Sequence, residues 1–226
     1  MDLVTARDIA TALPDIDTLR NRSLAAAMLD AILWPEWEGR RYSHTADWGG
    51  GQAATEIRDG CGNDCFIIYT PAGAFIRGFD HESPMARRSN PKQLWPGLVD
   101  DLPEVFAEFL TEPAFLGPDG LLAATFCMWR QTSGTHWQTG QVDYTNVPDI
   151  SDPDGAHDLL GLLCDPTTKS YRRFAAEYFG VDIDPVAVSH VFDLRPLTQS
   201  VVAGINAELT LDDLAADIAM SGYPTR

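Results

Sequence analysis

Long apolar runs and cysteines are both scarce in this 226-residue sequence. No apolar run approaches the roughly 18–20 residues that a membrane-spanning helix needs. The first eight residues do not pair a basic region with an apolar stretch, so we expect no secretory signal. Four cysteines in a chain of this length exclude a disulfide-stapled scaffold. We therefore expect a soluble protein that works in the cytoplasm.

Basic side chains are also few. The chain has 16 Lys and Arg against 33 Asp and Glu, which gives a formal net charge of −17. Such a charge repels phosphate backbones and anionic lipids, so we expect neither direct nucleic-acid binding nor membrane binding. It would steer a basic protein toward the surface. The alternative is that the charge only supports solubility and reflects the composition of the source genome.

Catalytic signature motifs are missing as well. The sequence has no Gly-x-Ser-x-Gly nucleophile motif and no His-Glu-x-x-His zinc motif. Gly49-Gly50-Gly51 lacks the Lys-Ser/Thr ending of a phosphate loop, so we interpret it as a turn. The many carboxylates leave a glycosidase-like pair open, but nothing selects two of them. We expect no cofactor.

Hydrophobic residues make up 45% and charged residues 22% of the chain, a globular composition. We predict one α+β domain over 1–226, with an antiparallel sheet of about six strands flanked by N-terminal helices and a C-terminal helical part. The helical N-terminal part spans 1–35, the sheet part 36–148 and an acidic helical part 149–226. Such a chain is long enough to bury a sizeable core.

Hydrophobic periodicity places the elements. Helical spacing over 3–33 is interrupted by Pro14, and Asp15 or Asp17 could cap the second helix. A period of two over 41–48 predicts a strand with His44 on its apolar face, as a hydrogen-bonded core residue. Further strands are expected at 52–58, 65–70, 74–79, 121–131 and 136–144, and further helices at 98–110, 155–164, 169–179, 185–194, 198–205 and 211–220.

The best candidate site follows the hairpin within Cys61–Met85. Its second strand ends in Asp80-His81-Glu82, a dense cluster of ionisable side chains at a strand end. His81 could be a general base or a metal ligand oriented by a carboxylate. In the structural alternative, Asp80 caps a turn and Glu82 pairs with Arg87 or Arg88.

Two further features near this hairpin carry open alternatives. Cys61 and Cys65 could join His81 in a metal site, or they could be unlinked thiols, because no second cysteine pair completes a zinc motif. Several tryptophans near element ends could form a binding rim, although core packing is their more usual role. The predicted binding set is Asp80, His81, Glu82, Arg87 and Trp137.

Three stretches carry a resemblance: Ala74–Met85 (AFIRGFDHESPM), Thr125–Arg130 (TFCMWR) and Gly222–Pro224 (GYP). Together they resemble a widespread group of bacterial proteins without an assigned activity. The resemblance covers about 34–224 and implies no catalytic residues. In acidity, size and α+β character the chain is also similar to immunity proteins of bacterial toxin systems.

The sequence favours a non-enzymatic acidic binding protein, an immunity-type or regulatory partner of a basic protein such as a toxin. The alternative is a small hydrolase or metal-dependent enzyme centred on Asp80, His81 and Glu82, with Trp137 from the second hairpin nearby. A structural subunit of a larger assembly is a third hypothesis. The oligomeric state is left open.

Overall fold

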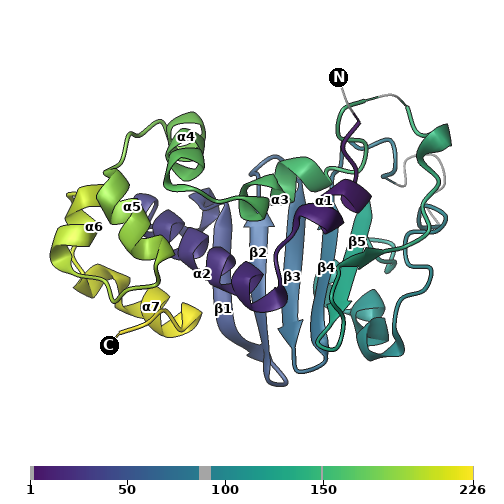
Figure 1. Ribbon diagram of the computed structural model, residues 1–226, viewed down its shortest axis with the longest axis horizontal. Coiled ribbons are helices and arrows are strands. Elements are labelled where there is room, and N and C mark those ends of the chain that lie inside the picture. Colours follow the sequence, from purple (N-terminus) through teal and green to yellow (C-terminus); the bar gives the residue numbers. More distant parts are fainter. Residues whose placement is uncertain (1–2, 87–92, 149, 226) are drawn as a thin grey trace.

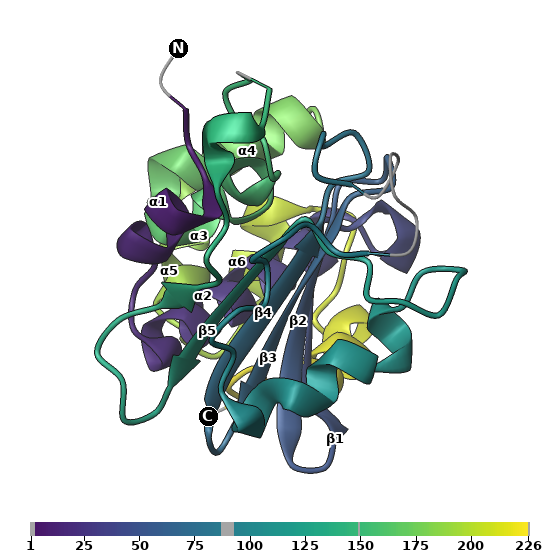
Figure 2. The ribbon, with the colours of Figure 1, turned by 90° about the vertical axis from the view of Figure 1, so that its right-hand side faces the viewer.

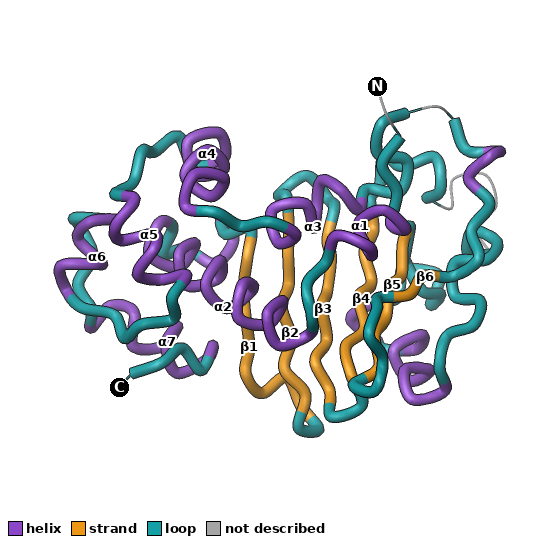
Figure 3. The backbone as a smooth tube through the Cα atoms, viewed as in Figure 1, coloured by secondary structure: helices purple, strands orange, loops and turns teal. Residues whose placement is uncertain are grey.

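The computed structural model describes residues 3–86, 93–148 and 150–225, and it confirms the α+β class. Within these ranges, six strands form one antiparallel sheet in the order β1-β2-β3-β4-β5-β6, so each strand pairs with its neighbour in the sequence (Figures 1 and 3). The strands are β1 (Tyr42–Gly49), β2 (Gln52–Arg58), β3 (Asp64–Thr70), β4 (Gly73–Phe79), β5 (Phe126–Gln131) and β6 (Gln138–Thr139).

Side-chain alternation divides the sheet into two packed faces. On β3, Ile67 points to one hydrophobic cluster and Ile68 to the other. The β3–β4 hairpin closes tightly at the pair Thr70 and Gly73. Gly73 has φ 147°, and a Cβ there would lie 2.1 Å from the carbonyl oxygen of Arg130, so only glycine fits. The predicted hairpin is confirmed.

Helices cover the first face, which we call the helical face. They are α1 (Ala6–Ala12), α2 (Ile16–Leu33) and α3 (Ala156–Cys164) (Figure 1). The predicted break at Pro14 is confirmed, and Asp15 caps α2 by accepting a hydrogen bond from the backbone N–H of Thr18 at 2.9 Å. Helix α2 buries Leu19, Met28 and Ile32 against the sheet.

The C-terminal helices gather around α2 beyond the β1 edge (Figure 1). They are α4 (Thr168–Tyr178), α5 (Pro185–Phe192), α6 (Gln199–Ile205) and α7 (Ala215–Ser221), close to the expected ranges. Asp184 caps α5 and Pro185 occupies its first turn, as predicted. The last helix begins with a 3₁₀ turn at Asp212–Leu214. No helix in the described ranges is long and apolar enough to cross a membrane.

An irregular segment, residues 93–125, covers the other face of the sheet, and we call it the lobe (Figure 2). Phe75 of β4 lies 5.3 Å from Phe109 and 6.3 Å from Phe106, measured between ring centroids. The predicted helix over 98–110 is wrong in extent, since only a 3₁₀ helix forms, at Glu104–Thr111. Pro103 cannot donate a helical hydrogen bond, and Asp101 has a left-handed φ of 64°.

The last two predicted strands are also shorter than expected. Residues 121–125 belong to the lobe, where Leu122 is buried and pairs with Leu116 in an isolated bridge. Of the strand predicted over 136–144, only Gln138–Thr139 forms a strand, β6. Its chain leaves the sheet because the Trp137 indole donates to the carbonyl of Pro14 at 2.6 Å and Gly140 packs closely against the carbonyl of Gly97.

Candidate functional site

Asp80 lies at the end of β4 and stabilises a turn. Its Oδ1 accepts hydrogen bonds from the backbone N–H groups of Glu82 at 2.8 Å and Ser83 at 3.3 Å. Its own N–H donates to the Thr125 hydroxyl at 3.0 Å. This is the turn-capping role that the sequence left open for Asp80. Glu82 is exposed, and Arg87 and Arg88 lie outside the described residues.

His81 is held by an amide oxygen. The Oδ1 of Asn63 accepts from the backbone N–H of His81 at 2.9 Å and lies 2.7 Å from its Nδ1. Because an amide oxygen only accepts, Nδ1 carries the proton in this contact. Asn63 is in turn bonded to Asp59. The Asn63 amide therefore helps to orient the ring of His81.

The structure does not bring Trp137 to this corner. Strand β5 runs from Phe126, opposite Gly78, to Gln131, opposite Gly73, and Trp129 pairs with Gln138 toward the latter end. Trp137 is buried beside Gln138 and packs in the core of the helical face. It lies toward the opposite end of the sheet from Asp80.

The cysteines near the hairpin differ in environment. Cys61 is exposed and Cys65 is buried, and both are free thiols. Burial raises the pKa of Cys65 well above its ordinary value, which makes this thiol unreactive. Across 3–86, 93–148 and 150–225, no group of three or more His, Cys, Asp or Glu side chains could hold a metal ion. The enzyme alternative centred on His81 stays a prediction.

Sequence reasoning missed two buried carboxylates, of which Asp30 is the first. It accepts from the backbone N–H groups of Arg41 at 2.9 Å and Tyr42 at 2.8 Å, and from the Tyr171 hydroxyl at 2.6 Å. Complete burial raises the pKa of Asp30 to about 7, against the opposing effect of these donors. Asp30 thus joins α2 to β1 and α4. The sequence signal that could have identified Asp30 is its position as the single charged residue in the apolar stretch 25–32.

Asp154 is the second buried carboxylate, and it is linked to Asp80 through the hydroxyl of Thr125. It accepts from the backbone N–H of Ala6 at 2.8 Å and the Tyr144 hydroxyl at 2.6 Å. Its own carbonyl accepts from the Thr125 hydroxyl at 2.6 Å. Burial raises the pKa of Asp154 to about 6. No periodicity or spacing in the sequence pointed to it.

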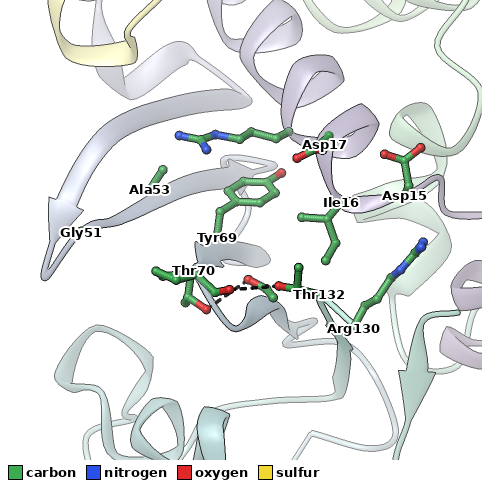
Figure 4. Close-up of a pocket in the computed structure, with 12 residues that line it drawn as sticks. Asp15, Ile16, Asp17, Gly51, Ala53, Tyr69, Thr70, Arg130 and Thr132 are labelled. Atoms are coloured by element: carbon green, nitrogen blue, oxygen red, sulfur yellow. Dashed lines mark hydrogen bonds between the residues drawn. The ribbon is translucent and has the colours of Figure 1, made fainter. Parts of the chain in front are cut away.

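A cleft of about 440 Å³ opens at the other end of the sheet, between the start of α2 and the ends of the central strands (Figure 4). Asp17 and Arg20 of α2 line one side and Arg130 of β5 lines another. Tyr69 and Ile16 supply an aromatic and an aliphatic surface. Burial raises the pKa of Tyr69, whose hydroxyl lies 3.1 Å from the Ser23 hydroxyl, so the phenol stays neutral.

The charged residues in the lobe sequence are all acidic. Between Lys92 and Arg130 the sequence has six acidic residues and no Lys or Arg. Five of the six side chains are exposed, while Glu112 is half-buried and accepts from a backbone N–H. The six residues are Asp100, Asp101, Glu104, Glu108, Glu112 and Asp119.

Some carboxylates of the acidic C-terminal part have cationic neighbours. Arg172 pairs with Asp182 at 2.5 Å, and Arg195 pairs with Asp193 at 3.1 Å. Asp217 is paired with Arg40 of the sheet part at 2.5 Å. Arginines thus neutralise part of the negative charge of the C-terminal part, whereas the lobe sequence contains no Lys or Arg.

Comparisons with protein-family models, with curated proteins and with solved structures give no match to this chain. Its function is therefore inferred from its own fold and side chains.

Proposed function

We propose that this protein is a non-enzymatic, cytoplasmic binding protein, and that the lobe receives a basic protein partner. The observation that carries the proposal is the run of six carboxylates on the lobe without a Lys or Arg among them. An acidic surface of this kind raises the association rate of a basic protein by electrostatic steering. An immunity-type or regulatory inhibitor of a basic toxin fits this description.

Apolar side chains between the carboxylates support the proposal. Val105 is 49% exposed and lies between exposed Glu104 and Glu108 on the 3₁₀ helix, and Leu121 is 39% exposed. Interfaces commonly combine apolar contacts at the centre with a polar rim. The lobe therefore offers both steering charge and apolar contact area to a partner.

Four of the lobe carboxylates, those of Asp100, Asp101, Glu104 and Glu108, make few contacts with the rest of the described structure. The side chains of Asp100 and Glu104 make no hydrogen bond or ion pair with any residue in the described ranges, and Glu108 accepts only from the exposed Gln52 amide at 3.2 Å. Asp101 accepts from the exposed Gln141 amide at 3.2 Å. Replacing these carboxylates should therefore change partner binding without changing the fold.

The test is affinity capture from a lysate of the source organism with two matched baits. The first bait is wild type, and the second carries Asp100→Asn, Asp101→Asn, Glu104→Gln and Glu108→Gln. We expect a basic protein to be retained by the wild-type bait at low salt and lost with the lobe variant. The association rate of the purified pair should fall with rising ionic strength.

The matched control neutralises four exposed carboxylates outside the lobe. It carries Asp165→Asn, Glu177→Gln, Glu208→Gln and Asp212→Asn, so its net charge equals that of the lobe variant. We expect this control to keep the partner. Equal capture by the lobe variant, or an association rate indifferent to salt, would contradict the proposal. Metal content and activity of a His81→Ala variant test the enzyme alternative separately.

A further inference from the structure

An apolar groove of about 530 Å³ opens on the lobe, the acidic surface proposed above to receive a partner. Three segments of the lobe meet there: residues 93–96, the end of the 3₁₀ helix at Leu110, and the stretch from Leu121 to Leu122. Leu122 is buried, whereas Leu121 is 39% exposed. The described residues that line the groove are Gln93, Leu94, Pro96, Leu110, Leu121 and Leu122. An exposed apolar groove of this kind is typical of a surface that another molecule covers.

The lobe's own hydrogen bonds and packing hold one wall of the groove in place. The backbone N–H of Gly117 donates to the carbonyl of Leu121 at 2.8 Å, and that of Ala123 donates to the carbonyl of Phe115 at 2.8 Å. Phe115 anchors this loop to the sheet, with its ring centroid 5.1 Å from that of Phe66 on β3. A groove that is formed in advance loses little conformational entropy when a partner side chain enters it.

The charged side chains that the lobe sequence places beside this groove are acidic. Asp119 lies at the edge of the groove, because its Oδ1 accepts from the backbone N–H of Leu121 at 3.2 Å. Glu108 and Glu112 are each two residues from Leu110, and the lobe sequence contains no Lys or Arg. A partner that fills the groove therefore gains most when its apolar side chain is flanked by cations.

The charge argues against two other occupants of the groove. A second copy of this chain would bring another net charge of −17 toward the lobe, and the juxtaposition of like charges is unfavourable. An uncharged apolar ligand would make no use of the carboxylates beside the groove. A basic polypeptide segment uses both the apolar centre and the polar rim.

We propose that the groove receives a basic segment of the partner protein in which leucine side chains are flanked by Lys or Arg. The leucine side chains enter the groove between Leu94, Leu110 and Leu121, and the cations contact the lobe carboxylates. This inference rests on the proposed function, because it names the kind of segment that the lobe receives. It goes beyond that function by assigning the anchoring contact to the apolar groove and not to charge alone.

The experiment titrates purified full-length protein with two end-blocked peptides of equal charge, Lys-Lys-Leu-Leu-Lys-Lys and Lys-Lys-Ser-Ser-Lys-Lys. Calorimetry measures the affinities, and NMR follows the leucine methyl groups of the protein. We expect the leucine peptide to bind at least about tenfold more tightly than the serine peptide, because only the leucine peptide buries apolar surface. The methyl signals of Leu94, Leu110 and Leu121 should shift with the leucine peptide and stay in place with the serine peptide.

Variants then assign the contact. Leu121→Ser removes a partly exposed side chain of the groove and should weaken the leucine peptide about fivefold without weakening the serine peptide. The matched control, Val186→Ser, removes an apolar side chain that is 71% exposed on α5 and should change neither peptide. The fourfold lobe variant at positions 100, 101, 104 and 108 should weaken both peptides, because both carry the same charge. Circular dichroism and melting curves check that all three variants are folded.

Three outcomes overturn the inference. The first is that the leucine peptide binds no more tightly than the serine peptide. The second is that Leu121→Ser and Val186→Ser have the same effect on the leucine peptide. The third is that the groove methyl signals shift when the protein alone is concentrated, or that uncharged N-acetyl-leucine amide binds as tightly as the leucine peptide. That third result would assign the groove to a second copy or to a small apolar ligand.

The failure of this inference differs from the failure of the proposed function. If both peptides bind equally and the fourfold lobe variant loses both, charge alone holds them, so the groove inference fails and the proposed function stands. The proposed function fails when the lobe variant captures the basic partner from the lysate as well as wild type does, whatever the two peptides show.

Discussion

On the helical face of the sheet, Asp30 and Asp154 are buried, and each accepts hydrogen bonds from backbone N–H groups and a tyrosine hydroxyl. On the lobe face, the carboxylates point outward and the interior is built from aromatic rings such as Phe75, Phe106 and Phe109. The same residue types therefore hold elements together on one face and charge the surface on the other.

Acidic side chains therefore have two roles in this protein: buried ones stabilise the fold, and exposed ones give the surface its negative charge. A buried carboxylate that satisfies backbone donors is costly to remove, because the donors are then left without partners. An exposed carboxylate contributes little to stability and is free to act on a partner. Four predictions test how far the two faces differ, in order of decreasing effect on stability.

The largest effect is expected from Asp30→Ala. It leaves the N–H groups of Arg41 and Tyr42 and the hydroxyl of Tyr171 without their acceptor. We expect the free energy of unfolding to fall by about 4 kcal/mol, measured by urea denaturation. Asp17→Ala, on the exposed start of the same helix, is the control and should cost less than about 1 kcal/mol. Similar losses for both variants would refute the distinction.

The aromatic interior of the lobe is probed by Phe106→Ala. Phe106 is fully buried and packs against Phe75 of β4 and Phe109. We expect a loss of about 3 kcal/mol in the free energy of unfolding, from lost apolar burial and the cavity left behind. The exposed neighbour substitution Val105→Ala should cost less than about 1 kcal/mol. A negligible effect of Phe106→Ala would mean that the lobe is not part of the cooperative core.

The buried carboxyls also predict an unusual pH dependence. Burial raises the pKa of Asp30 to about 7 and of Asp154 to about 6, above the ordinary Asp value. The folded state therefore binds more protons than the unfolded state between about pH 4 and 7. The contribution of these two carboxyls to stability is greatest at the acidic side of this window and falls as pH rises through it.

Urea denaturation at about pH 5.5, 6.5 and 8 measures this slope. Asn at position 30 cannot titrate, so Asp30→Asn should flatten the slope although it lowers stability at every pH. A free energy of unfolding that rises steadily with pH in the wild type would show that the pKa of neither Asp30 nor Asp154 is raised.

The smallest effect on stability is expected from the fourfold lobe variant at positions 100, 101, 104 and 108. These carboxylates are exposed, so we expect the melting temperature to stay the same or rise slightly as like-charge repulsion is relieved. A clear loss of stability would mean that the lobe carboxylates are structural, like those of the helical face.

Local patterns predicted most of the elements. Alternating apolar residues located β1, apolar runs on either side of a Pro/Gly segment located β3 and β4, and Pro14 with the Asp15 cap located the α1–α2 break. The segments at 98–144 were predicted less well, because their path depends on tertiary contacts that the local pattern does not contain. Trp137 bonds to Pro14 and Leu122 pairs with Leu116, so the strands expected around them shorten.

The candidate site shows the same limit. A cluster of ionisable residues at a strand end drew attention to Asp80 and His81, and the structure gives Asp80 a turn and His81 the Asn63 amide. Nothing in the local sequence links Asp17 and Arg20 to Arg130, because they are more than 100 positions apart. Their common cavity exists only once α2 lies across the strand ends.

By itself the sequence determined the α+β class, the strand hairpins, the helix caps and the net charge, because these follow from side-chain periodicity, backbone preference and composition. Only the tertiary structure decided which carboxylates are buried, which carboxylates the lobe exposes, and which charged groups share the cleft. Those properties depend on solvent exposure and on distances between residues far apart in the chain, and both arise when the sheet and its two covering layers come together.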